Sequence, residues 1–318
     1  VTRLVNAALR GKGNVSVARE EFTSGGIRYP PGTVLFDASN DLGNLAAKYH
    51  LRLRAIADRP KSAAKIREVR VGLYKPWIAS MDEGWTRWLL EQYEYNLKTV
   101  DNKAIKAGKL NGSFDAIVLP DVNKEVIVDG KPKREEDAMK YYQEFPPEYA
   151  EGISKDGTKN LKEFVQSGGT LIALAHSGDL LIDEFNIPVR NLLAKAKPED
   201  FLCPGSLLKV RIDSSHPVNY GMPSEGAAFV NEAIAYQTAL PGMEIQRWVL
   251  AWYPEEPEDI LLSGWIRGPE KLTRRAAAVA LTYGKGRIVL IGFRAQHRAQ
   301  TEGTFKMLFN AIHWAGMS

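Results

Sequence analysis

Apolar and polar positions follow one pattern up to about residue 69 and a different one afterwards. The first part alternates over short stretches, which is typical of small helices and strands separated by turns. The expected elements are a helix over 1–10, a strand over 14–22, a turn and strand over 25–36, a helix over 41–51 and a solvated linker over 61–67. Residues 1–69 are therefore predicted to form a connecting α+β segment ahead of a larger unit, residues 70–318.

From Arg70 onward, nearly all-apolar runs alternate with amphipathic ones. Runs such as VGLY, AIVL and TLIAL are typical of parallel strands that are buried on both faces. The expected strands lie at 70–75, 96–100, 115–120 and 170–175, and the expected helices between them lie at 80–92 and 160–169. This alternation predicts an α/β fold with a doubly wound, mainly parallel sheet and helices on both of its faces.

The first of these helices has a capping-box signature, with Ser80 at the N-cap and Glu83 three residues later. Its buried face is predicted from one apolar stripe, which consists of Met81, Trp85, Trp88, Leu89 and Gln92. Further on, 276–293 predicts a hairpin with a glycine-rich turn, and 301–316 predicts a closing helix. A long charged insertion near 122–157 is typical of a functional loop or a disordered segment.

Three loops are expected to meet at one edge of the sheet, because the carboxyl ends of parallel strands lie side by side. These loops are 76–85, 120–125 and 176–179. The last one follows an apolar strand and precedes an amphipathic segment, which is the layout of a nucleophile elbow. At such an elbow a reactive side chain occupies a sharp turn between strand and helix.

The elbow sequence departs from the patterns of known catalytic elbows. A hydrolase elbow has the pattern G-x-S-x-G, whereas here Ala175 stands two residues before Ser177. In a class I amidotransferase the elbow carries a cysteine, and Ala175 and His176 occupy that place. The single cysteine, Cys203, lies far along the chain before a proline. A binding loop or vestigial elbow is therefore favoured, and a hydrolase that uses Ser177 or His176 is the alternative.

A metal site is a further candidate at the same loop, because His176 and Asp179 form a His-x-x-Asp pair. His216 or His297 could supply a third ligand, as catalytic zinc sites require. Neither histidine is close in sequence, and a single cysteine excludes a CxxC motif. We expect a histidine that hydrogen-bonds within its loop, and no metal or other cofactor.

Two further groups of residues are candidates for ligand binding. Asp82 and Arg87 lie in the first turns after the first strand, although an acid–base pair at this spacing often supports a helix. Arg294, His297 and Arg298 follow a strong strand and precede a helix, where they could hold a carboxylate or phosphate. They could equally form ion pairs with Asp82, Glu83 or Asp179 across the cleft, and we favour that internal network slightly.

Composition narrows the class of protein. The 318 residues are 44% hydrophobic and 25% charged, with a formal net charge of +4, so we expect neither nucleic-acid binding nor a membrane span. The chain starts at Val1 without a signal peptide, which predicts a processed chain or a fragment of a longer protein.

Four long stretches resemble one known family, namely 70–93, 161–174, 203–223 and 284–312. They are similar to the glutamine amidotransferase-like region that follows the catalytic domain in bacterial zinc carboxypeptidases of the carboxypeptidase A type. The resemblance implies a class I glutamine amidotransferase-like, flavodoxin-like fold. It also implies that the parent protein is a metallocarboxypeptidase-like hydrolase, secreted or periplasmic, whose peptidase domain is the partner in the same chain.

The peptidase activity itself is not carried over, because the zinc-binding His-x-x-Glu pair of that family is absent from this sequence. The expected function is thus a non-catalytic accessory domain with a binding, assembly or structural role. A third alternative is a module that binds sugars or forms homo-oligomers, since related amidotransferase-like domains occur inside glycosidases.

Overall fold

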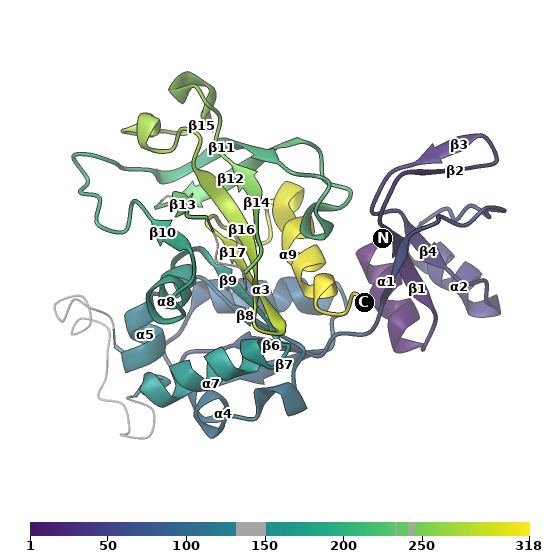
Figure 1. Ribbon diagram of the computed structural model, residues 1–318, viewed down its shortest axis with the longest axis horizontal. Helices are drawn as coiled ribbons and strands as arrows, with labels where there is room; N and C mark the ends of the chain where they lie inside the picture. The colour runs from purple at the N-terminus through teal and green to yellow at the C-terminus, as the bar shows by residue number, and fades with distance from the viewer. Residues whose placement is uncertain (132–150, 233, 241–244) are drawn as a thin grey trace.

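In the computed structural model of the chain, five parallel strands form one half of a large mixed sheet (Figure 1). The structure describes residues 1–131, 151–232, 234–240 and 245–318. Across the sheet the parallel strands are β7 (Leu97–Val100), β6 (Val71–Tyr74), β8 (Ala116–Leu119), β9 (Thr170–Leu174) and β17 (Gly286–Ile291). Numbered along the chain from β6, their order is 2-1-3-4-5, which is the flavodoxin-like order.

The predicted pairing of the first strongly apolar strands is confirmed. Val71 lies opposite Ala116, and Ala116 lies opposite Thr170, all in parallel register. Because every residue of β6, β8 and β9 is buried, these strands need apolar side chains on both faces. Burial on both faces therefore explains why these strands appear as continuous apolar runs in the sequence.

Helices cover both faces of the parallel half, as expected for a doubly wound sheet. One face carries α3 (Met81–Gln92) and α9 (Glu302–Trp314), and the other carries α4 (Asn102–Ala107), α5 (Lys124–Asp129), α7 (Ser154–Gln166) and α8 (Gly178–Glu184). Successive residues of a strand serve opposite faces: Val118 packs in the core that contains Leu89, and Ile117 packs in the core that contains Leu161.

The other half of the sheet is antiparallel, and the sequence pattern predicted only part of it. Beyond β17 come β16 (Ala276–Tyr283), β14 (Arg247–Trp252), β11 (Pro204–Ile212) and β12 (Glu225–Asn231), with short attached strands β10 (Val189–Asn191), β13 (Tyr236–Thr238) and β15 (Leu261–Ser263). The predicted hairpin is confirmed as β16–β17, where Tyr283 faces Gly286 and Gly284 has a φ of 59°. The prediction of a mainly parallel sheet therefore holds for the half that carries the three loops.

The predicted buried stripe of α3 is wrong in part. Trp88 is 47% exposed and so is Met81, whereas Glu83 and Thr86 are buried together with Leu89 and Leu90. The polar residues can be buried because each has a partner: Glu83 binds Arg87, and the Thr86 hydroxyl accepts a hydrogen bond from Gln296. Apolar periodicity alone does not reveal such satisfied polar positions.

The N-terminal segment has a small sheet of its own, in which β1 (Val15–Ala18) lies between β4 (Val34–Phe36) and β5 (Ala63–Ile66). The remaining elements are α1 (Thr2–Arg10), α2 (Asn40–Lys48) and the hairpin of β2 (Phe22–Ser24) and β3 (Ile27–Tyr29). The predicted linker over 61–67 is wrong, because it contains β5. Ala64 and Ile66 are buried while Ala63 and Lys65 are exposed, so a short alternation was present.

This segment docks against the end of the chain (Figure 1). Ile66 forms an antiparallel bridge with Met317, and the Arg67 N–H donates to the Gly316 carbonyl at 3.1 Å. Deeper in the contact, the Asn6 amide donates to the carbonyl of Tyr93 at 2.7 Å, and its oxygen lies 2.9 Å from Nε2 of the buried His313. A single asparagine thus joins α1 to two parts of the α/β unit.

Replacing Asn6 with alanine should lower the free energy of unfolding by about 1–3 kcal/mol, because a buried donor on His313 and the Tyr93 carbonyl lose their partner. Urea unfolding measures the change. Asn14→Ala is the matched control, since Asn14 hydrogen-bonds Asp37 in an exposed position. Equal losses in the two variants would contradict the role of Asn6.

The insertion predicted near 122–157 is described only at its two ends. It begins with α5 and closes with the first turn of α7, while residues 132–150 lie outside the described residues. Within the described ranges, none of the helices combines the length and apolarity that a membrane crossing requires.

Candidate functional site

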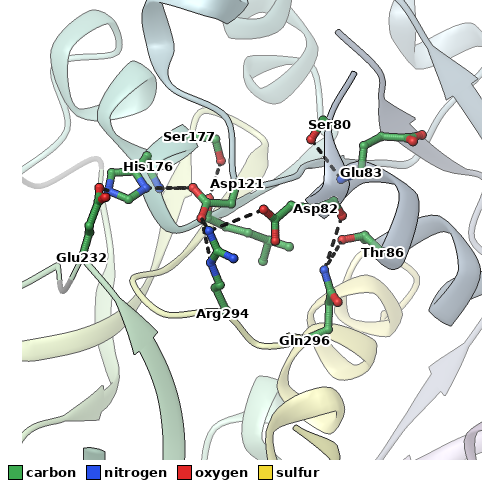
Figure 2. Close-up of polar contacts among 11 residues, drawn as sticks. Ser80, Asp82, Glu83, Thr86, Asp121, His176, Ser177, Glu232, Arg294 and Gln296 are labelled. Carbon is green, nitrogen blue, oxygen red and sulfur yellow. Dashed lines mark hydrogen bonds and ion pairs between the residues drawn. The ribbon is translucent and has the colours of Figure 1, made fainter. Parts of the chain in front are cut away.

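Four polar side chains meet where the parallel strands end (Figure 2). Asp82 lies at the start of α3 after β6, Asp121 follows β8, His176 follows β9 and Arg294 follows β17. The predicted meeting of the three loops is confirmed by the contacts between these residues. The sheet order puts all four strand ends along one edge, as it does in other doubly wound sheets.

His176 is held by Asp121 through both its ring and its backbone. Nδ1 lies 2.8 Å from Oδ1 of Asp121, and the His176 backbone N–H donates to the same oxygen at 3.2 Å. On the other side of the ring, Nε2 lies 3.5 Å from Oε2 of Glu232. Burial alone would lower the pKa of His176, but the hydrogen bond and negative charge of Asp121 outweigh it, so the pKa is raised.

Arg294 joins the two aspartates. Its Nε and Nη2 both lie 3.2 Å from Oδ2 of Asp121, and Nη2 lies 3.5 Å from Oδ2 of Asp82. Burial raises the pKa of Asp82 to about 6, against the opposing charge of Arg294. Burial also acts to raise the pKa of Asp121, but the hydrogen bond and charge of His176, with the charge of Arg294, leave it lowered. The ion-pair network that we favoured for Arg294 is thus present with Asp82.

The turn after β9 has the strained geometry of an elbow. Ala175 has a φ of 47°, a left-handed conformation that costs a non-glycine residue about 1–3 kcal/mol. A short 3-10 turn, Ala175–Ser177, then leads directly into α8. Gly178 is required at the next position, because a Cβ there would lie 2.9 Å from the hydroxyl of Tyr236. The residue at the strained position of this elbow is an alanine, whose methyl group cannot act as a nucleophile.

Ser177 faces the interior of the protein. Its side chain is fully buried, and its hydroxyl lies 2.8 Å from the carbonyl of Leu174 and 3.1 Å from that of Leu119. A hydroxyl that donates to a backbone carbonyl fastens the turn to the ends of β8 and β9. No histidine is its hydrogen-bond partner among the residues that the structure describes. Ser177 therefore stabilises the conformation of the elbow through these hydrogen bonds.

A cavity of about 350 Å³ opens beside the elbow. Its polar lining comes from His176, Asp179, Asn191 and Glu232, and its apolar lining includes Leu193, Ala196, Phe201, Cys203 and Ile234. A concave site in which a few polar groups converge beside apolar side chains is a usual form of a small-molecule site.

The other candidates from the sequence lie around this centre in different settings. Asp179 is at the cavity, where Asn191 donates to its Oδ1 at 3.0 Å. Arg87 binds Glu83 and the hydroxyl of Thr99, so it supports α3 and does not join Asp82. The His297 ring stacks on Phe229 with centroids 3.9 Å apart.

Arg298 and Cys203 are both described by the structure, and neither forms a hydrogen bond or ion pair with the four polar side chains of the site. Arg298 is exposed and acts on Asp82 only through its charge. Cys203 is buried beside the cavity, its thiol lies 3.7 Å from the Val230 carbonyl, and burial raises the pKa of that thiol. A thiol with a raised pKa is a poor nucleophile.

Asp121 and Glu232 are central to the site and were not singled out in the sequence. Asp121 is the first residue after a strongly apolar strand and its proline, and that position at the carboxyl edge was a usable signal. Glu232 follows β12, far along the chain, and has a φ of 60°. Only the tertiary structure brings it to His176.

The arrangement around His176 differs from the metal site that its spacing from Asp179 suggested. His176 turns its ring to Asp121 and Glu232, and Asp179 is bound by Asn191. In the described part of the chain, histidine, cysteine, aspartate and glutamate side chains form no group of three that could hold a metal ion.

Comparisons with known proteins give similarity at the level of shape only. No protein-family model and no curated protein matches the sequence. A ThuA-like protein from Parabacteroides merdae is 14% identical with a TM-score of 0.46, over 79% of this chain and 90% of that one. A Thermoplasma acidophilum protein that is described as part of a GMP synthase is 13% identical with a TM-score of 0.44, over 77% of this chain and 94% of that one.

A third solved structure, the β-galactosidase of Rahnella sp. R3, is 12% identical with a TM-score of 0.43. The similar region covers 77% of this chain and 31% of the galactosidase. The mixed α/β fold, with its parallel half of the central sheet, follows from the strand pairing itself.

Proposed function

We propose that this chain is a ligand-binding module with a class I glutamine amidotransferase-like fold and without the nucleophile of that class. The observation that carries the proposal is Ala175, which occupies the strained position of the elbow with a φ of 47°. Nucleophilic catalysis needs an attacking group and a base together. Here the base position has His176 and Asp121, while the attacking group is missing and a cavity lies beside them.

The charge state of His176 supports binding over base catalysis. Carboxylates lie at both ring nitrogens, Asp121 at Nδ1 and Glu232 at Nε2. Such surroundings favour the protonated imidazole, which has no free lone pair to accept a proton. A hydrolase in which His176 activates water is therefore the weaker alternative, although His176 lines the cavity.

We further propose that the module is an accessory domain of a zinc carboxypeptidase-like protein. The support for this part is the resemblance that we infer from four long sequence stretches, 70–93, 161–174, 203–223 and 284–312. The full reading frame of the gene provides the test: we expect a domain with a His-x-x-Glu zinc motif to precede Val1. A reading frame without one would overturn the accessory role and leave the ligand-binding role standing.

Binding without turnover can be measured directly. We expect a fluorophosphonate probe to leave Ser177 unlabelled, and glutamine and ester substrates to remain intact, because Ser177 is buried. In a fragment screen by ligand-observed NMR, we expect hits that Ala196→Phe abolishes by filling the cavity. Ala227→Phe is the matched control, since Ala227 is exposed on β12 outside the cavity.

Two results would count against the proposal. Fluorophosphonate labelling that disappears in Ser177→Ala, accompanied by ester turnover, would show a working hydrolase. Fragment hits that are equally frequent with the wild type and with Ala196→Phe would show that the cavity is not the binding site.

A further inference from the structure

We infer that the cavity beside the elbow binds a small molecule with a protonated amine on an apolar body, and that the amine lies between Asp179 and Glu232. This inference rests on the proposed binding function and names the chemical class of the ligand. The proposed function alone leaves open whether the ligand is cationic, neutral or anionic, and this inference specifies a cation.

The charges that line the cavity favour a cation. Asp179 and Glu232 contribute two carboxylates, and His176 is the one cationic group among the described lining residues, which include neither lysine nor arginine. His176 is already engaged by Asp121 on the far side of its ring. The cavity therefore has an excess of negative charge, and an ammonium group would offset it.

Asp179 is the carboxylate best placed to receive the amine. Asn191 donates to Oδ1 of Asp179 at 3.0 Å, and the Asn191 oxygen accepts the N–H of Leu193 at 3.1 Å, so the amide has one fixed orientation. This neutral donor orients the carboxylate without neutralising it, and Oδ2 is left to a second donor. Among the described residues, no lysine or arginine lies within ion-pair distance of Asp179.

The raised pKa of Asp179 agrees with a ligand that brings a positive charge to this carboxylate. Burial raises the pKa of Asp179 above its usual value, and the hydrogen bond from Asn191, with the charges of His176 and Lys124, only partly offsets this. An ammonium group beside the carboxylate would remove that imbalance, because an opposite charge stabilises the ionised form.

Glu232 and the apolar wall define the rest of the ligand. Glu232 is 72% exposed and lies at the mouth of the site, so its carboxylate can turn from His176 toward a bound amine. Apart from Asn191, the other lining side chains are apolar, and Leu193, Phe201 and Ile234 are among them. An aromatic or branched aliphatic body would bury its surface there, and one amine would supply the specificity.

Three molecules of one shape and different charge test the inference: benzylamine, benzyl alcohol and benzoate. Isothermal titration calorimetry at pH 7 should show that benzylamine binds roughly tenfold or more tightly than either of the others, because a charge-assisted hydrogen bond to a partly buried carboxylate is strong. Asp179→Asn should reduce the preference for benzylamine over benzyl alcohol to about threefold or less. Glu232→Gln should have a smaller effect, because Glu232 is exposed.

Asp259→Asn is the matched control, since Asp259 is an exposed aspartate that does not line this cavity. We expect it to leave the three affinities unchanged. If benzylamine and benzyl alcohol bind equally and both are lost in Ala196→Phe, the amine inference fails and the binding function stands. If none of the three binds, or if Asp259→Asn acts like Asp179→Asn, the amine inference is overturned, and the fragment screen decides separately on the binding function.

Discussion

Replacing Asp121 with alanine should lower the free energy of unfolding by about 3–5 kcal/mol at pH 7. The side chain of Asp121 is only 7% exposed, and it accepts hydrogen bonds from His176 and Arg294. Its removal leaves the guanidinium of Arg294, which is 14% exposed, with the more distant Asp82 as its remaining anionic partner. Urea unfolding followed by tryptophan fluorescence measures the loss.

Asp183→Ala provides the comparison for that result. Asp183 also pairs with a cation, Lys124, but both side chains are substantially exposed, and exposed pairs contribute about 0–1 kcal/mol. Asp121→Ala should therefore be the more destabilising variant by at least about 2 kcal/mol. Similar losses in the two variants would mean that the cluster at the sheet edge is screened by solvent and contributes little.

Acid should destabilise the protein through two buried histidines. Burial lowers the pKa of His313 to about 4 and that of His216 to about 4, from the usual 6.5. Between pH 6.5 and pH 4 each of these histidines is protonated in the unfolded chain and neutral in the folded protein. The free energy of unfolding therefore decreases as the pH falls from about 6.5 toward about 4. Each histidine should account for about 3 kcal/mol over this interval.

His313→Gln isolates one of these contributions, because glutamine keeps a donor for Asn6 and does not titrate. Stability measured in urea at pH 7 and pH 4.5 should fall less in this variant than in the wild type, by about 2–3 kcal/mol. His50→Gln is the control, since His50 is exposed. An acid response in His313→Gln that equals the wild-type response would show that His313 is accessible to protons.

The parallel half of the sheet was predictable because its burial has a simple signature. Strands such as β8 are apolar at every position, because both of their faces are buried. The strand β5 was missed because four residues of weak alternation, AAKI, look like a charged linker. Its status as a strand depends on pairing with β1 and with residues near the end of the chain.

The site was predictable to the extent that sheet order brings loops together. Asp82, His176 and Arg294 follow strands whose ends share one edge, and the contacts of Arg294 follow from that order. The sequence did not predict Glu232 as a site residue. Its position depends on the antiparallel half of the sheet, whose strand order no local pattern encodes. The inward direction of Ser177 was likewise hidden, because a turn sequence does not state which way its hydroxyl points.

The docking of the N-terminal segment on the last residues of the chain has a consequence for biosynthesis. The bond between Asn6 and His313 joins residues 307 positions apart, and the bridge from Ile66 to Met317 joins residues 251 positions apart. On the ribosome the first residues emerge long before their docking partners are translated. The strands β1, β4 and β5 pair with one another within residues 15–66, so their sheet can form early, whereas its docking contacts can form only after residues 313–317 have been synthesised.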